Sequence, residues 1–92
     1  MGVEIICLHG YVTGRVQGVW YRDSTQRKAL QYGLLGWVRN LEDGRVEVML
    51  QGSRDSVQQL KQWLHDGPPL AVVTWVDLKQ IPVSALDGFH VR

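Results

Sequence analysis

The sequence has 92 residues, which is enough for one hydrophobic core and too few for two independent domains. Hydrophobic residues make up 45% and charged residues 21%, which is ordinary globular usage and argues against disorder. A formal net charge of +1 excludes a broad basic field for nucleic acid or an anionic membrane surface, so any anion must be bound locally. We therefore expect a single domain over residues 1–92.

The cysteine content and the N-terminal segment bear on the compartment. Cys7 is the only cysteine, which permits neither an intrachain disulfide nor a cysteine-built zinc site and suits a reducing cytoplasm. Glu4 stands where a signal peptide carries positive charge, and no apolar run approaches the roughly 20 residues of a membrane-spanning helix. We expect a cytoplasmic protein with no membrane partner, in which Cys7 is a buried thiol; an intermolecular disulfide through Cys7 stays open.

The first third of the chain predicts a strand, a loop and a helix. Residues 4–15 are rich in β-branched and apolar residues, with Gly10 and Gly14 as weak points or bulges. Beyond the loop, apolar and small residues recur at helical spacing, namely Tyr21, Thr25, Ala29 and Tyr32. Gly33 then ends the helix.

The middle of the chain predicts a β-hairpin. Residues 36–40 and 45–50 both have strand composition, and Asp43 and Gly44 between them supply turn chemistry. These two strands should pair antiparallel.

The last part predicts a second helix and two strands. Ser53 is a plausible N-cap with Asp55 in the first turn, and the helix should end before Gly67. Its apolar stripe consists of Val57, Leu60, Trp63 and Leu64. Residues 70–81 read as a valine-rich strand, and residues 88–92 as a short edge strand. The element order is that of an α+β, ferredoxin-like split βαβ sandwich, with an antiparallel sheet and two helices on one face.

The loop between the first strand and the first helix has the composition of an anion-binding site. Gly14 and Gly18 let the chain bend so that several backbone N–H groups converge at a helix N-terminus, where the helix dipole is positive. Arg22, in the first helical turn, can hold two phosphate oxygens with its planar guanidinium. Two glycines alone would favour an ordinary turn with surface arginines. The spacing fits neither G-x-x-x-x-G-K-[ST] nor G-x-G-x-x-G, and Cys7 lies too early for a cysteine phosphatase.

Four stretches together resemble the acylphosphatase family. They are GRVQGVWYR at residues 14–22, GWVRNLEDGRVEVMLQG at 36–52, GPPLAVV at 67–73 and GFHV at 88–91. The likeness runs over nearly the whole chain and implies a ferredoxin-like fold, in agreement with the element order. Because no zinc-finger region follows Arg92, we expect a free-standing small acylphosphatase rather than part of a hydrogenase-maturation protein.

The resemblance also implies roles for individual residues. Arg22 becomes the phosphate-binding arginine, and Asn40 becomes the residue that orients the attacking water. Without the surrounding GWVRN, Asn40 would read as a turn-starting asparagine at a strand end. The backbone cradle for the phosphate would be formed by Arg15, Val16, Gln17, Gly18, Val19 and Trp20. Trp20 departs from the family, which more often has phenylalanine or a smaller residue there, so the acyl-group preference is left open.

The chemistry implied is direct attack of water on an acyl phosphate, which yields a carboxylate and inorganic phosphate without metal, cofactor or covalent intermediate. The leaving carboxylate has a conjugate acid with a pKa of roughly 4, so it departs without a general acid. We expect a monomer that acts on a small-molecule acyl phosphate. The three histidines lack metal-ligand spacing, and Trp37, Trp63 and Trp75 are expected to pack against the fold.

Two other functions are compatible with this fold. A ferredoxin-like sheet can bind single-stranded RNA, but the aromatic and basic run K/R-G-F/Y-G/A-F-V-x-F/Y is missing, so no nucleic-acid partner is expected. A ligand sensor that keeps the anion cradle and lacks turnover is the other alternative, and phosphate binding without hydrolysis would select it.

Overall fold

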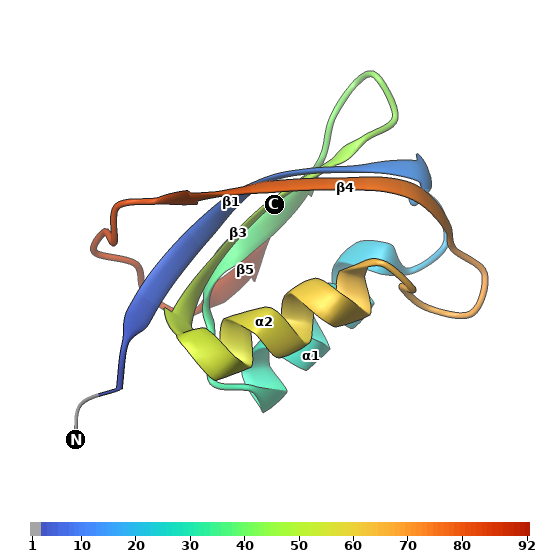
Figure 1. The fold of residues 1–92 in the computed structure, drawn as a ribbon. Coiled ribbons are helices and arrows are strands. Elements are labelled where there is room, and N and C mark those ends of the chain that lie inside the picture. Colours follow the sequence, from blue (N-terminus) through green and yellow to red (C-terminus); the bar gives the residue numbers. More distant parts are fainter. Residues whose placement is uncertain (1–2) are drawn as a thin grey trace.

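The computed structural model describes residues 3–92, and its helices and strands follow the predicted order (Figure 1). The elements are β1 (Ile5–Arg15), α1 (Tyr21–Gln31), β2 (Leu35–Asn40), β3 (Val46–Ser53), α2 (Arg54–Leu64), β4 (Val72–Ile81) and β5 (Phe89–Val91). Within the described residues, neither helix is long and apolar enough to cross a membrane.

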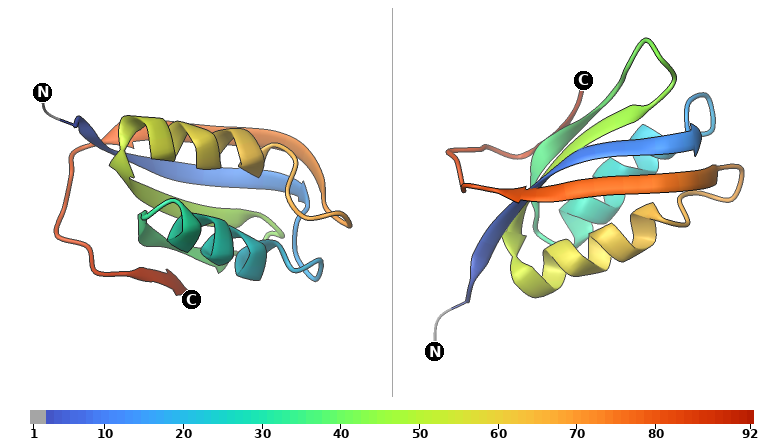
Figure 2. Two further views of the ribbon diagram at one scale, coloured as in Figure 1. Left: turned by 90° about the horizontal axis from the view of Figure 1, so that it is seen from below. Right: turned by 45° about the horizontal axis from the view of Figure 1, so that its top comes forward.

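The strands form one sheet in the order β4-β1-β3-β2-β5. Among β4, β1, β3 and β2, each strand pairs antiparallel with its neighbour, as a ferredoxin-like sheet requires, and both helices lie on the same face (Figure 2). β5 pairs parallel with β2, where Gly36 lies opposite Phe89, so the full sheet is mixed. The α+β, ferredoxin-like fold class is therefore confirmed, with a parallel edge strand as an addition.

The core lies between the sheet and the two helices. Alternate residues of β1 and β3 point toward the helices and are fully buried, while the intervening residues face the side that carries no helix. The helices contribute Tyr21, Thr25, Ala29, Val57, Leu60 and Leu64. Each fully buried large aliphatic side chain stabilises the fold by about 1.5–3 kcal/mol. The Tyr21 hydroxyl donates a hydrogen bond to Leu64 O at 2.7 Å, which ties the start of α1 to the end of α2.

Several local signals in the sequence act as predicted. Gly33 has φ 70° just beyond the end of α1, and Ser53 Oγ accepts a hydrogen bond from Ser56 N at the start of α2. The pairing of β1 with β4 shifts register between Thr13 and Gly14, so Gly14 marks a bulge.

The packing of the tryptophans is only partly as expected. Trp37 is 9% exposed and Trp63 packs against the core. Trp75 is 67% exposed, so the expectation that it packs is wrong. Trp75 lies on β4, an edge strand, and its neighbour Val76 packs against the core. Because successive side chains of a strand point to opposite faces, Trp75 points away from the core.

Candidate active site

The loop between β1 and α1 exposes a run of backbone donors. Gly18 and Trp20 have φ values of 72° and 67°, so the chain turns twice into the left-handed region just before α1. Within residues 3–92, no hydrogen bond is made by the backbone N–H groups of residues 16–20. Successive N–H groups in this geometry, beside the positive end of a helix dipole, form a concave seat for an anion.

This loop forms one wall of a cavity of about 300 Å³. The cavity brings together both side chains that the sequence singled out, because Arg22 and Asn40 line it with Gly18, Trp20 and Val91. Arg15, the first residue of the predicted cradle, is the last residue of β1 and lies opposite Val72. A cavity of this volume is at the small end of ligand sites, which fits a small substrate.

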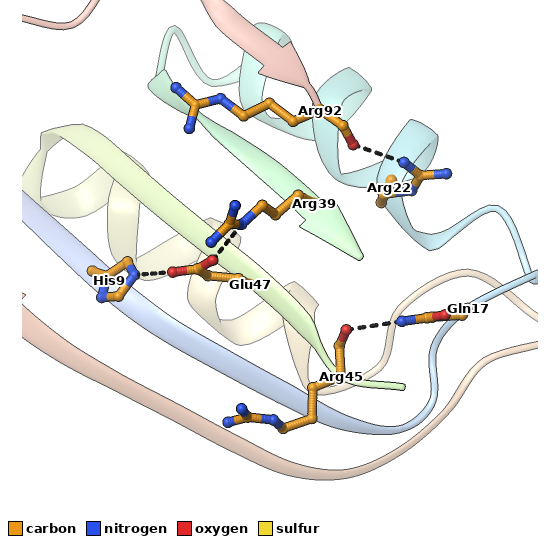
Figure 3. A network of polar contacts seen from close by, with 7 residues as sticks. All are labelled: His9, Gln17, Arg22, Arg39, Arg45, Glu47 and Arg92. Carbon is orange, nitrogen blue, oxygen red and sulfur yellow. Dashed lines mark hydrogen bonds and ion pairs between the residues drawn. The ribbon is translucent and has the colours of Figure 1, made fainter. Parts of the chain in front are cut away.

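Arg22 reaches the cavity from the first turn of α1 and is held from the far end of the chain. Its Nη1 donates a hydrogen bond to Arg92 O at 2.8 Å (Figure 3). The backbone N–H of Arg92 donates a hydrogen bond to Val38 O at 2.9 Å. The guanidinium of Arg92 also lies over the Trp37 ring, 4.5 Å from its centroid, and these two contacts fix the position of Arg92. No other donor of Arg22 makes a hydrogen bond within the described residues. One end of the guanidinium is therefore anchored while the rest can bind an anion.

Asn40 is the last residue of β2 and lies opposite Val46 of β3. Its side chain is exposed and makes no hydrogen bond within residues 3–92. The antiparallel pairing of β2 with β3 fixes its backbone, so the amide is presented to the cavity from a rigid strand end.

Gln17 connects the loop to the hairpin that carries Asn40. Its Nε2 donates hydrogen bonds to Leu41 O at 2.8 Å and to Arg45 O at 3.0 Å; Figure 3 shows the second bond. Sequence reasoning assigned Gln17 only a backbone role and did not foresee this side-chain contact. No spacing signal could have revealed it, because its acceptors are backbone carbonyls of another segment.

The other titratable groups near the loop have structural partners or face solvent. Asp23 lines the cavity and is exposed, and it forms no ion pair within the described residues. Burial raises the pKa of Tyr21 far above its usual range, so its hydroxyl remains a donor to Leu64 O. Cys7 is buried, which confirms the expectation from the sequence, and burial raises the pKa of its thiol.

The histidines make contacts away from the cavity. His9 Nε2 lies 2.7 Å from Glu47 Oε2 on the sheet face without helices, and Glu47 also accepts a hydrogen bond from Arg39 (Figure 3). His65 and His90 contact the backbone carbonyls of Lys61 and Asp87. Residues 3–92 contain no cluster of three or more histidine, cysteine, aspartate or glutamate side chains placed to hold a metal ion.

Comparison with known proteins identifies the family. The acylphosphatase family model matches residues 8–91. An acylphosphatase of Pseudomonas paraeruginosa is 53% identical over 87 residues, which cover 95% of this chain and 96% of that protein. Among solved structures, an acylphosphatase from Coxiella burnetii superimposes with a TM-score of 0.92 at 44% identity, covering 96% of this chain and 93% of its own. An acylphosphatase from Bacillus subtilis superimposes with a TM-score of 0.90 at 30% identity, covering 97% of this chain and 99% of its own. The chain therefore belongs to the acylphosphatase family.

Proposed function

We propose that this chain is an acylphosphatase that hydrolyses the carboxyl–phosphate bond of small acyl phosphates by direct attack of water on phosphorus. Family membership and about 50% identity to curated acylphosphatases support the activity itself. The observation that carries the mechanism is the single cavity shared by Arg22, Asn40 and the loop of unpaired N–H groups.

The phosphate group is bound by the loop and by Arg22. Phosphoryl transfer passes through a loose transition state whose charge is spread over the equatorial oxygens, so catalysis consists mainly of positioning and charge stabilisation. The N–H groups of residues 15–20 bind these oxygens together with the positive end of the α1 dipole. The guanidinium of Arg22 supplies a full positive charge and a planar pair of donors.

Asn40 orients the attacking water. Its side-chain oxygen accepts one hydrogen of the water, and because the amide is neutral it does not repel the anionic substrate. Water attacks phosphorus as the P–O bond to the acyl group breaks, and the bonding pair leaves with the carboxylate. The proton of the water passes to a phosphate oxygen. Since a carboxylate leaves unprotonated, the reaction needs no general acid. Arg22 and the loop N–H groups supply the positive charge that a metal ion provides in other phosphoryl-transfer sites, so the proposed reaction uses no metal or other cofactor.

The decisive experiment compares wild type with Asn40→Ala on benzoyl phosphate in the presence of a chelator. Wild type should hydrolyse the substrate without metal, and the variant should lose about 10² to 10³ in kcat, the usual effect of removing one preorganised polar group. Matched urea midpoints would verify folding. Turnover near the wild-type rate in Asn40→Ala would contradict the role of Asn40. Phosphate binding by a wild type that hydrolyses nothing would instead indicate a sensor.

We further propose a monomeric cytoplasmic enzyme whose only partner is its small-molecule substrate. The near-neutral charge, the single buried cysteine and a cavity sized for one small anion support this assignment. Size-exclusion chromatography with light scattering tests the monomer.

A further inference from the structure

Trp20 combines high exposure with a rare backbone conformation. It is 72% exposed, the highest value among the large hydrophobic residues that the structure describes as exposed. It is also the only non-glycine residue in the described chain with a positive φ, a conformation that bulky side chains rarely adopt. Its indole forms no aromatic pair or cation–π contact within residues 3–92. An exposed, strained tryptophan of this kind contributes little to packing.

Trp20 lines the cavity, where few other apolar residues are accessible to solvent. Val16 and Tyr21 also line the cavity but are each only 1% exposed, and the Tyr21 hydroxyl is bound to Leu64 O. Val91 is half-buried. Among the apolar residues that line the cavity, Trp20 is therefore the most accessible to solvent, and Val91 is the next.

An acyl phosphate presents two chemically different ends to this cavity. The loop N–H groups and Arg22 are matched to the phosphate, and in-line attack by water at Asn40 sends the acyl group away from Asn40. The acyl group must then meet whatever lines the rest of the cavity. A flat indole is suited to stacking against a planar aromatic group, and it offers little to a two-carbon acyl chain.

We infer that Trp20 selects the acyl group, so that this enzyme prefers aromatic acyl phosphates to short aliphatic ones. The inference rests on the proposed function, because it takes the phosphate to be bound by the loop and Arg22. Trp20 is a specificity-determining contact here through its side chain, in addition to its backbone N–H in the cradle.

The test is the ratio of kcat/KM for benzoyl phosphate to that for acetyl phosphate, which share the phosphate and differ only in the acyl group. Trp20→Asn removes the indole while keeping a residue that tolerates positive φ, so the loop conformation is retained. The ratio should fall about tenfold in Trp20→Asn, the effect of uncovering on the order of 50 Å² of apolar contact. Trp20→Phe should keep most of the preference, because a ring remains.

Trp75→Thr is the matched control, since Trp75 is almost as exposed but lies on β4 outside the cavity. Its ratio should equal that of wild type. An unchanged ratio in folded Trp20→Asn, or an equal loss on both substrates, would overturn the inference.

A second measurement separates this inference from the proposed hydrolysis. Benzoylphosphonate and acetylphosphonate carry the same acyl groups on a carbon–phosphorus bond that cannot be hydrolysed in this way, and calorimetry gives their Kd values. If wild type hydrolysed neither acyl phosphate, the proposed function would be wrong. Tighter binding of benzoylphosphonate that disappears in Trp20→Asn would still support the role of Trp20, and equal binding of the two phosphonates would refute it.

Discussion

At the scale of single residues, Arg22 shows why the type of cation matters. Its guanidinium has five N–H donors in a fixed plane. One of them donates a hydrogen bond to Arg92 O, and this bond sets the direction of the remaining donors. A lysine ammonium in its place would keep the charge but could not both bind Arg92 O and present a planar pair of donors to phosphate.

Arg22→Lys should therefore lower kcat/KM for benzoyl phosphate by about 10² or more, although the net charge is unchanged. Steady-state kinetics on the purified variant measures this, and inhibition by inorganic phosphate reports on the same site. Arg27→Lys, an exposed change on α1 outside the cavity, is the control and should behave as wild type. Activity of Arg22→Lys within a few fold of wild type would mean that charge alone suffices.

Gln17 is a positioning residue whose loss should affect the site more than the fold. Gln17→Leu removes the bonds to Leu41 O and Arg45 O, which should cost about 1–2 kcal/mol of stability. Because the loop is then no longer tied to the Asn40 hairpin, we expect kcat/KM to fall about tenfold and the inhibition constant of inorganic phosphate to rise.

A matched control is Ser53→Ala, which removes the N-cap of α2 at a similar cost of about 1 kcal/mol, outside the cavity. If Ser53→Ala lost as much activity as Gln17→Leu, the effect of Gln17 would be one of stability alone.

At the scale of elements, the close pairing of β1 with β4 depends on Gly10. A Cβ built at Gly10 would lie 1.8 Å from Asp77 O of β4, a backbone atom that cannot move without parting the strands. Gly44, in the β2–β3 hairpin, has φ 94° and open space around the same position. Gly10 is thus required because a Cβ atom would clash with β4, and Gly44 because its backbone conformation disfavours other residues.

Gly10→Ala should destabilise the fold by about 3 kcal/mol or more, because overpacking against the backbone forces the sheet to open. Gly44→Ala should cost only about 1 kcal/mol, the penalty of a left-handed residue. Urea unfolding followed by circular dichroism compares them. Equal losses in the two variants would show that β1 and β4 separate easily.

At the scale of the whole molecule, buried side chains from both helices and four strands form one core, and the radius of gyration is 12.3 Å. A compact domain of this length is expected at about 12 Å. That residues 1–92 form one independent domain stays a prediction, which a single cooperative unfolding transition would support.

Acid should destabilise the fold through its paired carboxylates. Burial alone would raise the pKa of Glu47, but hydrogen bonds from His9 and Arg39 outweigh it and hold the pKa below its usual range. Hydrogen bonds from Arg54 and Arg45 likewise lower the pKa values of Glu4 and Asp43. Groups with a lowered folded pKa stabilise the protein above their unfolded pKa of about 4, and this contribution is lost as the pH falls through the folded values.

Urea midpoints measured between pH 6 and pH 3 should therefore fall with decreasing pH, with the change concentrated below about pH 4.5. Glu47→Gln should be less stable than wild type at pH 6 and should show a weaker pH dependence, because it cannot be protonated. If the urea midpoints of wild type and Glu47→Gln fell in parallel as the pH decreased, groups other than Glu47 would cause the acid sensitivity.

The sequence by itself determined the features that depend on neighbouring residues. The turn at Asp43 and Gly44, the cap at Ser53 and the end of α1 at Gly33 follow from backbone and side-chain preferences that act within a few residues. The spaced signature stretches also identified the family and singled out Arg22 and Asn40, whose roles remain predictions.

Only the tertiary structure decided the contacts between distant segments. The bond from Arg22 to Arg92 O, the two bonds of Gln17, the parallel pairing of β5 with β2 and the exposure of Trp75 all depend on which strands become neighbours. Backbone carbonyls are the acceptors in three of these contacts, and every residue has one, so no residue type in the sequence marks them. Packing of the shared core selects among them, because it sets the strand order that brings the loop before α1, the end of β2 at Asn40 and the last strand at Val91 to one cavity.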